Sequence, residues 1–530
     1  MDRSYNLVDQ PFIPCINANG QRVELGLRDT LVRARELREI RDDSPLVTVA
    51  LHRLLLAILH RVFGPKSLSE WGSLFVKGHW DPAPLGAYFS RWMRRFDLFS
   101  DNRPFYQTAG METPEPLPAV SLYDQFSAGH NATLFDHTTD LDTAGLTPAE
   151  AARGLVARQA FAIGFGKSPV CKISGREVPT GYRTDAPLTR GATMVINGAN
   201  LFETLACNLT AYKDDPAQDL PVWEQDDPER LMDQKLPNGR IDLYTWQSRR
   251  LRLILAEDDD KPPRVGRVHF AQGRSLHKDV SDPMKPYRRD EQRAWVPFTI
   301  DPRKAVWRDS ASLLQIAHRT DRDQPPSAIQ WAARAVGYLP PARAITLAVY
   351  GVATDTGKAA SLLLWRHETM PLPLVYLGDE VLLSCLAEAI AAAEQAADAL
   401  RNATWALGDN LCPGSGGGKE RRNRIRDFVQ GLQADTRYWA QLEQPFRRLL
   451  LDLPGDEPHR SACRTGWADT VLAAAHRSFD QIVEGLGDSS RVLRAVYSDT
   501  PWGARKTLNI ALSQVHSRTK ETAHEPTRAD

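Results

Sequence analysis

The longest apolar pattern in the first half of the chain runs through residues 45–64, PLVTVALHRLLLAILHRVFG. Apolar residues occupy nearly every side of this segment, which predicts a helix buried in a hydrophobic core. A second helix is predicted after Thr147-Pro148-Ala149-Glu150, a capping box with proline at the first helical position, followed by AARGLVARQAFAI. Short β-like runs and proline-rich connections surround these helices. Residues 1–370 are therefore predicted to form a large, irregular, mixed α+β domain.

The pattern changes after residue 378, where apolar residues recur at intervals of three and four over long segments with few prolines. Turn sequences such as CPGSGGG, LPGDEP and GDSS separate these segments. The four predicted helical segments are 379–408, 419–453, 467–487 and 490–519. We expect them to form a C-terminal antiparallel four-helix bundle domain at 378–519, followed by a polar, disordered tail at 520–530.

Length and charge agree with this division. A chain of 530 residues is long enough for two or three domains, because single cores stop growing near about 250–300 residues. Lys plus Arg and Asp plus Glu each number 66, so the net charge is zero and no global field attracts nucleic acid or a membrane. Any site for a polyanion must therefore be a local patch.

The cysteines and the N-terminus indicate a reduced, cytoplasmic, soluble protein. The six cysteines are scattered without a C-x-x-C pair, so we expect free thiols, no metal site and no cofactor. The opening residues, MDRSYNLVDQ, lack the apolar core of a signal peptide, and no uncharged apolar stretch of about 18 residues occurs. We therefore expect no membrane partner.

The stretch FAIGFGKSPVCKISG contains Gly166-Lys167-Ser168, which matches the end of a nucleotide-binding phosphate loop. The full loop, G-x-x-x-x-G-K-[ST], requires a glycine at position 161, where this chain has Phe161. The loop should also follow a strand, whereas a capped helix is predicted here. The register and the context both exclude an ATP site.

Other catalytic patterns are also missing. The sequence has no G-x-S-x-G elbow, no H-E-x-x-H helix, and no histidines at metal-ligand spacing with a carboxylate. We predict that the protein is not an enzyme and has no catalytic residues.

Two basic stretches are candidates for contact with a polyanion. Residues 264–293 carry eight basic residues, interleaved with aromatic residues and glycines. A second run opens a predicted bundle helix at 419–426, where positive charges oppose the helix dipole. The alternative interpretation of both stretches is a solvated surface. The cations are Arg264, Arg267, Arg274, Lys278, Lys285, Arg288, Arg289 and Arg293 in the first stretch, and Lys419, Arg421, Arg422, Arg424 and Arg426 in the second.

Several motifs together resemble the CasA family, the large subunit of the type I-E CRISPR surveillance complex Cascade. YNLVDQPFIPCINANG resembles the family's opening L-x-D-x-x-[WF]-I-P-V, and FDLFSDNRPFYQTAG resembles its R-P-F-x-Q-T segment. IGFGK resembles its glycine loop, and the DPMKPYRR segment and the helical C-terminal region follow in the same order. The resemblance covers essentially the whole chain.

The resemblance implies a non-catalytic subunit that recognises the protospacer-adjacent motif in double-stranded DNA from the minor groove. Such a subunit promotes strand opening and R-loop formation and recruits the helicase-nuclease. The implied partners are the other Cascade subunits, the CRISPR guide RNA, the target duplex and the recruited helicase-nuclease. The protein reads the short motif and base pairing reads the sequence.

The resemblance also implies which residues act. The DNA-binding residues are Gly164, Phe165, Gly166 and Lys167 of the glycine loop, with Lys278 entering the minor groove and Arg274 as the alternative. The strand wedge falls on Thr356, Gly357, Lys358 and Ala359, and a loop contacting the guide-RNA end falls on Leu134, Phe135 and Asp136. Lys167 replaces a glycine of some relatives.

Two alternatives remain at this point: an orphan cytosolic enzyme with a pocket in the N-terminal domain, and a scaffold that does not contact DNA. A deep pocket with clustered carboxylates or histidines of shifted pKa would favour the enzyme. Exposed loops that converge beside a basic face would favour DNA binding.

Overall fold

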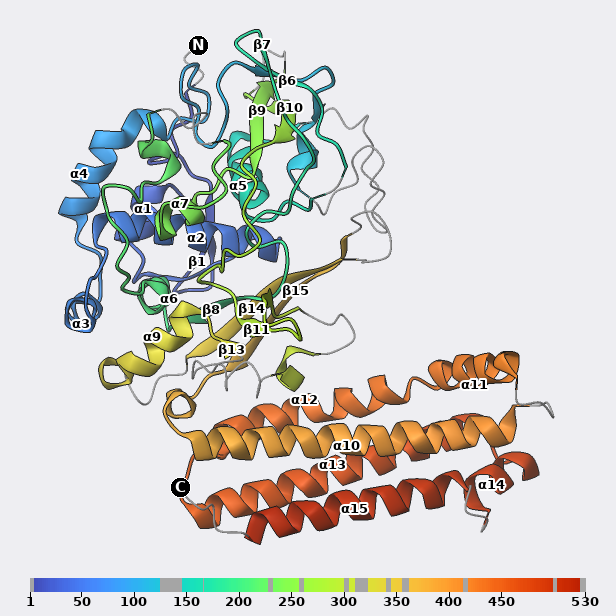
Figure 1. Ribbon diagram of the computed structural model, residues 1–530. Coiled ribbons are helices and arrows are strands. Elements are labelled where there is room, and N and C mark those ends of the chain that lie inside the picture. Colours follow the sequence, from blue (N-terminus) through green and yellow to red (C-terminus); the bar gives the residue numbers. More distant parts are fainter. Residues whose placement is uncertain are drawn as a thin grey trace. The chain divides into compact units, whose positions relative to one another are not determined.

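The computed structural model describes residues 4–123, 145–164, 166–226, 232–256, 262–299, 305–309, 323–339, 345–354, 362–412, 418–498 and 503–524. These residues fall into two compact units (Figure 1). The first comprises the described residues up to Val306 and those from 323 to 369, and the second comprises 307–309 and the described residues from 370 onward. The predicted class, a mixed α+β region followed by long helices, is confirmed.

Short antiparallel sheets and helices build the first unit. The sheet orders among the described residues are β2-β1-β3, β4-β6-β7, β5-β10-β9, β12-β11-β13 and β15-β14-β8. The strands are β1 Ile13–Asn17, β2 Arg22–Leu25, β3 Leu37–Ile40, β4 Met111–Glu112, β5 Leu117–Pro118, β6 Cys171–Ile173, β7 Arg176–Val178, β8 Thr193–Asn197, β9 Arg249–Leu255, β10 Val265–Gln272, β11 Tyr287–Arg289, β12 Trp295–Pro297, β13 Asp323–Gln324, β14 Thr346–Thr354 and β15 Leu362–Pro371. The helices are α1 Leu27–Val32, α2 Pro45–Val62, α3 Leu68–Lys77, α4 Pro82–Trp92, α5 Pro148–Ala160, α6 Leu201–Asn208, α7 Arg240–Tyr244 and α9 Ser327–Ala335.

Helix α2 forms the centre of this unit, as the apolar pattern predicts, and its residues from Pro45 to His60 are buried. By length and composition α2 could cross a membrane, but here it is a core helix. It carries the buried Arg53, which forms an ion pair with the buried Asp282 at 2.8 Å and donates to the Leu243 carbonyl at 2.7 Å. The opposite charge of Asp282 and the carbonyl acceptor compensate the Arg53 guanidinium for its burial in the core.

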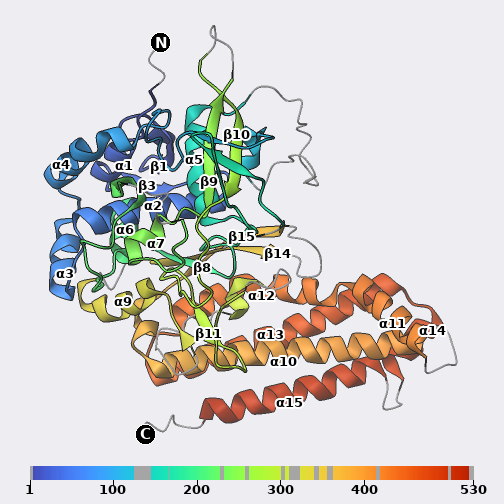
Figure 2. The same cartoon turned by 45° about the horizontal axis from the view of Figure 1, so that its top comes forward.

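Helix α5 positions the glycine loop. Its capping box is confirmed, because the Thr147 side chain accepts from the Glu150 N–H while the Glu150 carboxylate accepts from the Thr147 N–H. The helix packs against α2 and β9 and ends at Ala160, so the chain enters the glycine loop from a helix (Figure 2). The predicted context, which excluded a phosphate loop, is therefore correct.

The second unit consists of long helices that lie side by side (Figure 1). They are α10 Glu380–Leu411, α11 Lys419–Leu432, α12 Ala434–Asp452, α13 Glu457–Leu486, α14 Ser490–Tyr497 and α15 Ala504–His524. Two of the four predicted segments are each divided into two helices, and α13 begins ten residues before its predicted start at 467 because Asp456 caps it and Pro458 follows in its first turn. Helix α15 continues past residue 519, so the polar tail is helical as far as His524, and residues 525–530 lie outside the described part.

One segment departs from the predicted domain boundaries. Residues 307–309 precede residue 370 in the chain but belong to the second unit. The Trp307 ring stacks on Phe446 of α12 at 4.4 Å, and Arg308 forms an ion pair with Glu394 of α10 at 2.7 Å. Long-range ring and ion-pair contacts, which a local pattern does not encode, fix this assignment.

Candidate nucleic-acid interface

The glycine loop pairs with a second loop of the first unit. Residues 162–164 and 166–168 run antiparallel to residues 181–186, and an isolated β-bridge joins Lys167 to Tyr182. The backbone hydrogen bonds are Ala186 N–H to Ala162 O (2.8 Å), Arg183 N–H to Gly166 O (3.0 Å) and Ser168 N–H to Gly181 O (2.9 Å). The second loop, which the sequence analysis did not single out, therefore determines where the glycine loop lies.

The two described glycines of this loop are needed for different reasons. A Cβ atom on Gly164 would lie 2.5 Å from the Asp185 nitrogen, and the Gly164 N–H donates to the Asp185 carboxylate at 2.7 Å. Gly166 has a φ of +69°, in the left-handed region that favours glycine. Among the described residues other than its chain neighbours, Arg183 Nη2 at 3.5 Å is the atom within 4 Å of the position of its missing Cβ. The tight contact at Gly164 is internal to the chain, and an open side is found at Gly166.

The lysine and serine of the sequence that resembles a phosphate loop lie in different environments. Lys167 is exposed, whereas Ser168 is buried and its hydroxyl accepts from the Gln272 N–H at 2.9 Å. A phosphate loop would need that hydroxyl for a magnesium ion. Through this hydrogen bond, Ser168 instead connects the glycine loop to the end of β10.

Gln272 connects three segments that meet at this site. Its carboxamide oxygen accepts from the Thr184 N–H at 2.9 Å, and its Nε2 donates to the Thr184 hydroxyl at 3.1 Å. The same oxygen accepts from Arg249 at the start of β9 at 3.3 Å. Gln272 is 3% exposed and was missed by the sequence analysis, since a single glutamine at the end of a strand carries no recognisable signal. It links the glycine loop, the 181–186 loop and the segment that leads to Lys278.

Lys278 lies on the surface in the turn after this segment. The turn is closed by the Val280 N–H, which donates to the His277 carbonyl at 3.1 Å. Lys278 is exposed, and its ammonium group forms no ion pair with the part of the chain that the structure describes. It is therefore accessible to a ligand.

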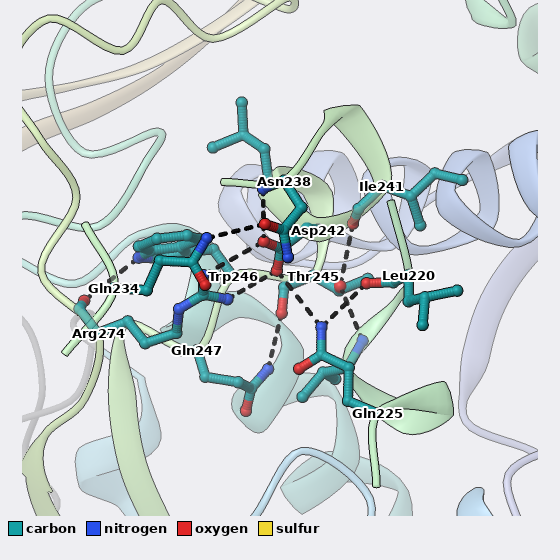
Figure 3. Close-up of polar contacts among 12 residues, drawn as sticks. Leu220, Gln225, Gln234, Asn238, Ile241, Asp242, Thr245, Trp246, Gln247 and Arg274 are labelled. Atoms are coloured by element: carbon teal, nitrogen blue, oxygen red, sulfur yellow. Dashed lines mark hydrogen bonds and ion pairs between the residues drawn. The ribbon is translucent and has the colours of Figure 1, made fainter. Parts of the chain in front are cut away.

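Arg274, the alternative to Lys278, lies inside the unit (Figure 3). Its guanidinium forms two hydrogen bonds to the Asp242 carboxylate, at 2.6 and 3.2 Å, and lies 3.5 Å from the centre of the Trp246 ring. Arg274 and Asp242 are 3% and 1% exposed. A bidentate, stacked and buried guanidinium is a structural group, so we keep Lys278 and withdraw Arg274 as a candidate for the minor groove.

Other cations of the basic stretch 264–293 also contact the protein's own atoms. Lys285 is buried and donates to the Pro187 carbonyl at 2.6 Å, and burial lowers its pKa to about 8. Arg267 donates to the Pro116 carbonyl, and Arg289 lies over the Trp295 ring at 4.8 Å. This stretch is thus not one continuous cationic surface. In the second unit, Arg421 of the other basic run pairs with Asp409 at 2.6 Å, while Lys419 is exposed.

The first unit has a cavity of about 190 Å³ whose lining carries no catalytic cluster. The described residues that line it include no histidine and no carboxylate, and it is smaller than the roughly 300–1,000 Å³ typical of ligand pockets. Its lining is Arg95, Asn102, Arg103, Pro104, Phe105, Tyr106, Gln107, Thr108, Ala109, Val222, Trp223, Met232 and Gln247. The R-P-F-x-Q-T motif therefore forms a wall of this cavity.

Histidines and cysteines give no metal centre in the described residues. No group of three or more His, Cys, Asp or Glu side chains is placed to hold an ion there. His269 accepts from the Thr113 N–H at 3.0 Å, and burial lowers its pKa. All six cysteines lie in the described part of the chain, and none of them is in a disulfide bond.

Three groups of predicted residues lie outside the described part of the chain. They are Phe165 of the glycine loop, the wedge residues Thr356, Gly357, Lys358 and Ala359, and the guide-end residues Leu134, Phe135 and Asp136. Their roles stay predictions. The described candidates are Gly164, Gly166, Lys167 and Lys278.

The fold and the site define an α+β protein whose second unit consists of long helices. The candidate site is a cluster of loops with exposed lysines in the first unit. The family model for CRISPR-associated protein Cse1 matches residues 6–483. The chain belongs to this Cse1 family, and the resemblance to CasA seen in the sequence is confirmed.

Individual relatives agree along nearly the whole chain. The CRISPR-associated protein CasA/Cse1 of Thermus thermophilus is 30% identical over 506 residues, covering 93% of this chain and 95% of the relative. A crystal structure of Thermus thermophilus CasA matches with a TM-score of 0.79 and 26% identity, covering 97% of this chain and all of the other. A chain of a "CRISPR RNA-guided surveillance complex" shares the fold at 22% identity, with a TM-score of 0.73 and coverage of 98% and 100%.

Proposed function

We propose that this chain is the non-catalytic large subunit of a type I-E Cascade complex that recognises the protospacer-adjacent motif in duplex DNA from the minor groove. In this proposal it promotes strand opening and R-loop formation, works with the other subunits and the guide RNA, and recruits the helicase-nuclease. Family membership supports the complex, and the loop cluster supports the contact with DNA.

The observation that carries the proposal is the convergence of three segments at Gln272. Backbone and side-chain hydrogen bonds hold the glycine loop, the 181–186 loop and the segment before Lys278 together. Two cations from this cluster, Lys167 and Lys278, are exposed. A rigid support with long, exposed lysines can place one ammonium group in a groove and another on a phosphate.

The cavity in the first unit argues against the orphan enzyme. Its lining has no acid or histidine to transfer a proton, and the described residues hold no metal-binding cluster. The described lining of this cavity therefore offers no candidate catalytic group for an enzyme.

Reconstitution with guide RNA and partner subunits tests the proposal. Target binding is measured over a library of flanking motifs for the parent and for Lys278→Ala and Lys167→Ala. We expect Lys278→Ala to weaken binding to motif-containing duplex most, with a smaller loss for Lys167→Ala. The matched control is Lys77→Ala, an exposed lysine at the end of α3. Unchanged affinity of both variants at moderate salt would remove these residues from the site.

A further inference from the structure

Arg183 lies beside the glycine loop, in the 181–186 loop that pairs with it. Its N–H donates to the Gly166 carbonyl at 3.0 Å, which fixes the backbone of the 181–186 loop at this position. The side chain is half-buried, and its Nε is buried with no hydrogen-bond partner. A buried N–H group without an acceptor costs free energy, so this position needs an explanation.

The charges around Arg183 make that position more unusual. Burial lowers the pKa of its guanidinium, and the second cause of the lowered pKa is another cation, Arg158 of α5. Arg158 packs over the Phe270 ring at 5.3 Å and donates to the Ser121 carbonyl at 2.7 Å. Two arginines are therefore held near each other in a partly desolvated place.

The carboxylate closest in sequence does not neutralise Arg183. Asp185 lies two residues further along the chain, but it pairs with Arg190 at 2.8 Å and accepts from the Gly164 N–H at 2.7 Å. No salt bridge joins Arg183 to an acid of the described residues. An anion from outside the chain would supply the missing negative charge.

The structure leaves room for such an anion at Gly166. Around the position of its missing Cβ, and apart from its neighbours in the chain, Arg183 Nη2 at 3.5 Å is the atom of the described residues that lies within 4 Å. The exposed Lys167 follows directly and is joined by a β-bridge to Tyr182, next to Arg183. A glycine without a side chain, a guanidinium fork and a lysine at one surface are groups that bind phosphate.

We propose that Arg183, together with Gly166 and Lys167, forms an oxyanion site that binds a backbone phosphate of the nucleic acid. The source of the phosphate rests on the proposed function, whereas the oxyanion site itself does not. In this site Arg183 contacts the phosphate and carries no sequence preference, because phosphate contacts are the same for every base pair. Motif preference then depends on Lys278 in the groove.

The first experiment uses the free chain and inorganic phosphate. Thermal unfolding is measured in phosphate and in chloride at equal ionic strength for the parent, for Arg183→Gln and for the control Arg176→Gln, an exposed arginine on β7. We expect phosphate to raise the Tm of the parent and of Arg176→Gln more than that of Arg183→Gln. In chloride, Arg183→Gln should be at least as stable as the parent, because it removes one of two neighbouring cations.

Equal stabilisation of the parent and Arg183→Gln by phosphate would overturn the oxyanion site. A clear loss of stability of Arg183→Gln in chloride would also overturn it, because Arg183 would then be a structural group. Arg183→Lys keeps the positive charge but removes the planar guanidinium. If the guanidinium binds phosphate through two N–H groups, phosphate should stabilise Arg183→Lys more than Arg183→Gln but less than the parent.

The second experiment uses the reconstituted complex with guide RNA and identifies the source of the phosphate. The affinity for target duplex is measured over a salt series and over several flanking motifs. We expect Arg183→Gln to reduce the slope of log K against log salt by about 1 and to weaken binding equally for all motifs. A phosphate effect on the free chain with an unchanged slope in the complex would overturn the assignment to nucleic acid. If the parent complex binds no duplex, the proposed function fails, while the first experiment still decides the oxyanion site.

Discussion

Arg274 and Lys278 lie four positions apart in one basic stretch, yet the structure places them in opposite environments. Arg274 is buried against Asp242 and Trp246, and Lys278 is exposed in a turn. The difference arises from the position of each residue relative to β10, which ends at Gln272. A charged residue just after a strand end is still covered by the unit, whereas one in the following turn reaches the solvent.

We therefore predict opposite effects of alanine at these two residues. Arg274→Ala leaves the Asp242 carboxylate buried without its cation and should lower the free energy of unfolding by about 3–5 kcal/mol. Lys278→Ala should change it by less than about 0.5 kcal/mol, as for other exposed positions. Urea unfolding of the free chain measures both values. A loss below about 1 kcal/mol for Arg274→Ala would contradict a structural role for the pair.

At the scale of elements, the helices of the second unit show how a local conformation divides a predicted segment. Helices α11 and α12 meet at Gln433, which has a φ of +51° and whose N–H donates to the Gln430 carbonyl at 3.2 Å. The sequence pattern predicts one helix over 419–453, but Gly431 lies inside α11 and the break falls two residues later, at Gln433. An exposed glutamine in the left-handed region ends the first helix at an energetic cost.

Glycine at this position should therefore stabilise the second unit. Gln433→Gly removes the strain of a side chain at positive φ and should raise the free energy of unfolding by about 0.5–1 kcal/mol. The control is Gln430→Gly, an exposed glutamine inside α11, which should lower it by about 1 kcal/mol. Chemical unfolding followed by circular dichroism measures both. A destabilising Gln433→Gly would show that the side chain has a further role.

The segment before β11 gives a prediction of pH dependence. Burial lowers the pKa of Lys285 to about 8, below that of a lysine in an unfolded chain at about 10.4. Between these pH values the unfolded state binds more protons than the folded state, so stability rises with pH across this window. Below about pH 8 both states bind the proton and Lys285 gives no further pH dependence.

The test compares the parent with Lys285→Met. The free energy of unfolding of the parent minus that of the variant should increase as the pH rises from about 8 to about 10. Ionisation of the buried tyrosines is common to both proteins and cancels in this difference. Lys278→Met, at an exposed lysine, should give a constant difference. A constant difference for Lys285→Met as well would exclude a lowered pKa.

At the scale of the whole molecule, the balanced charge limits what the free chain can do. With 66 basic and 66 acidic residues, long-range attraction to DNA is absent, and local contacts must supply the affinity. The candidate site offers few exposed cations, since several in the basic stretch are engaged with the protein's own atoms.

The free chain should therefore bind duplex DNA weakly, with a Kd above about 1 μM at physiological salt, as for non-specific binding. Fluorescence anisotropy with a motif-containing duplex and with a scrambled duplex measures this. The assembled complex is the positive control. Nanomolar binding by the free chain would show that it has a larger DNA surface than the loop cluster.

The sequence by itself determined the elements whose signals are local, and it identified the family. The capping box at Thr147 fixed the start of α5, the apolar pattern fixed α2, and Phe161 excluded a phosphate loop. The order of short motifs along the chain was enough to indicate the Cse1 family. Each of these signals lies in a short stretch of sequence, and the order of the stretches needs only the chain itself, so they can be read without a fold.

Only the tertiary structure decided which charges face the solvent and which segments meet. Gln272 bonds to Thr184 across 88 residues, Arg274 pairs with Asp242 across 32 residues, and Arg183 lies against Gly166. Burial and pairing depend on non-local packing, which a charge pattern does not contain. For that reason the sequence located the glycine loop, while the structure separated Lys278 from Arg274 and placed Arg183 beside Gly166.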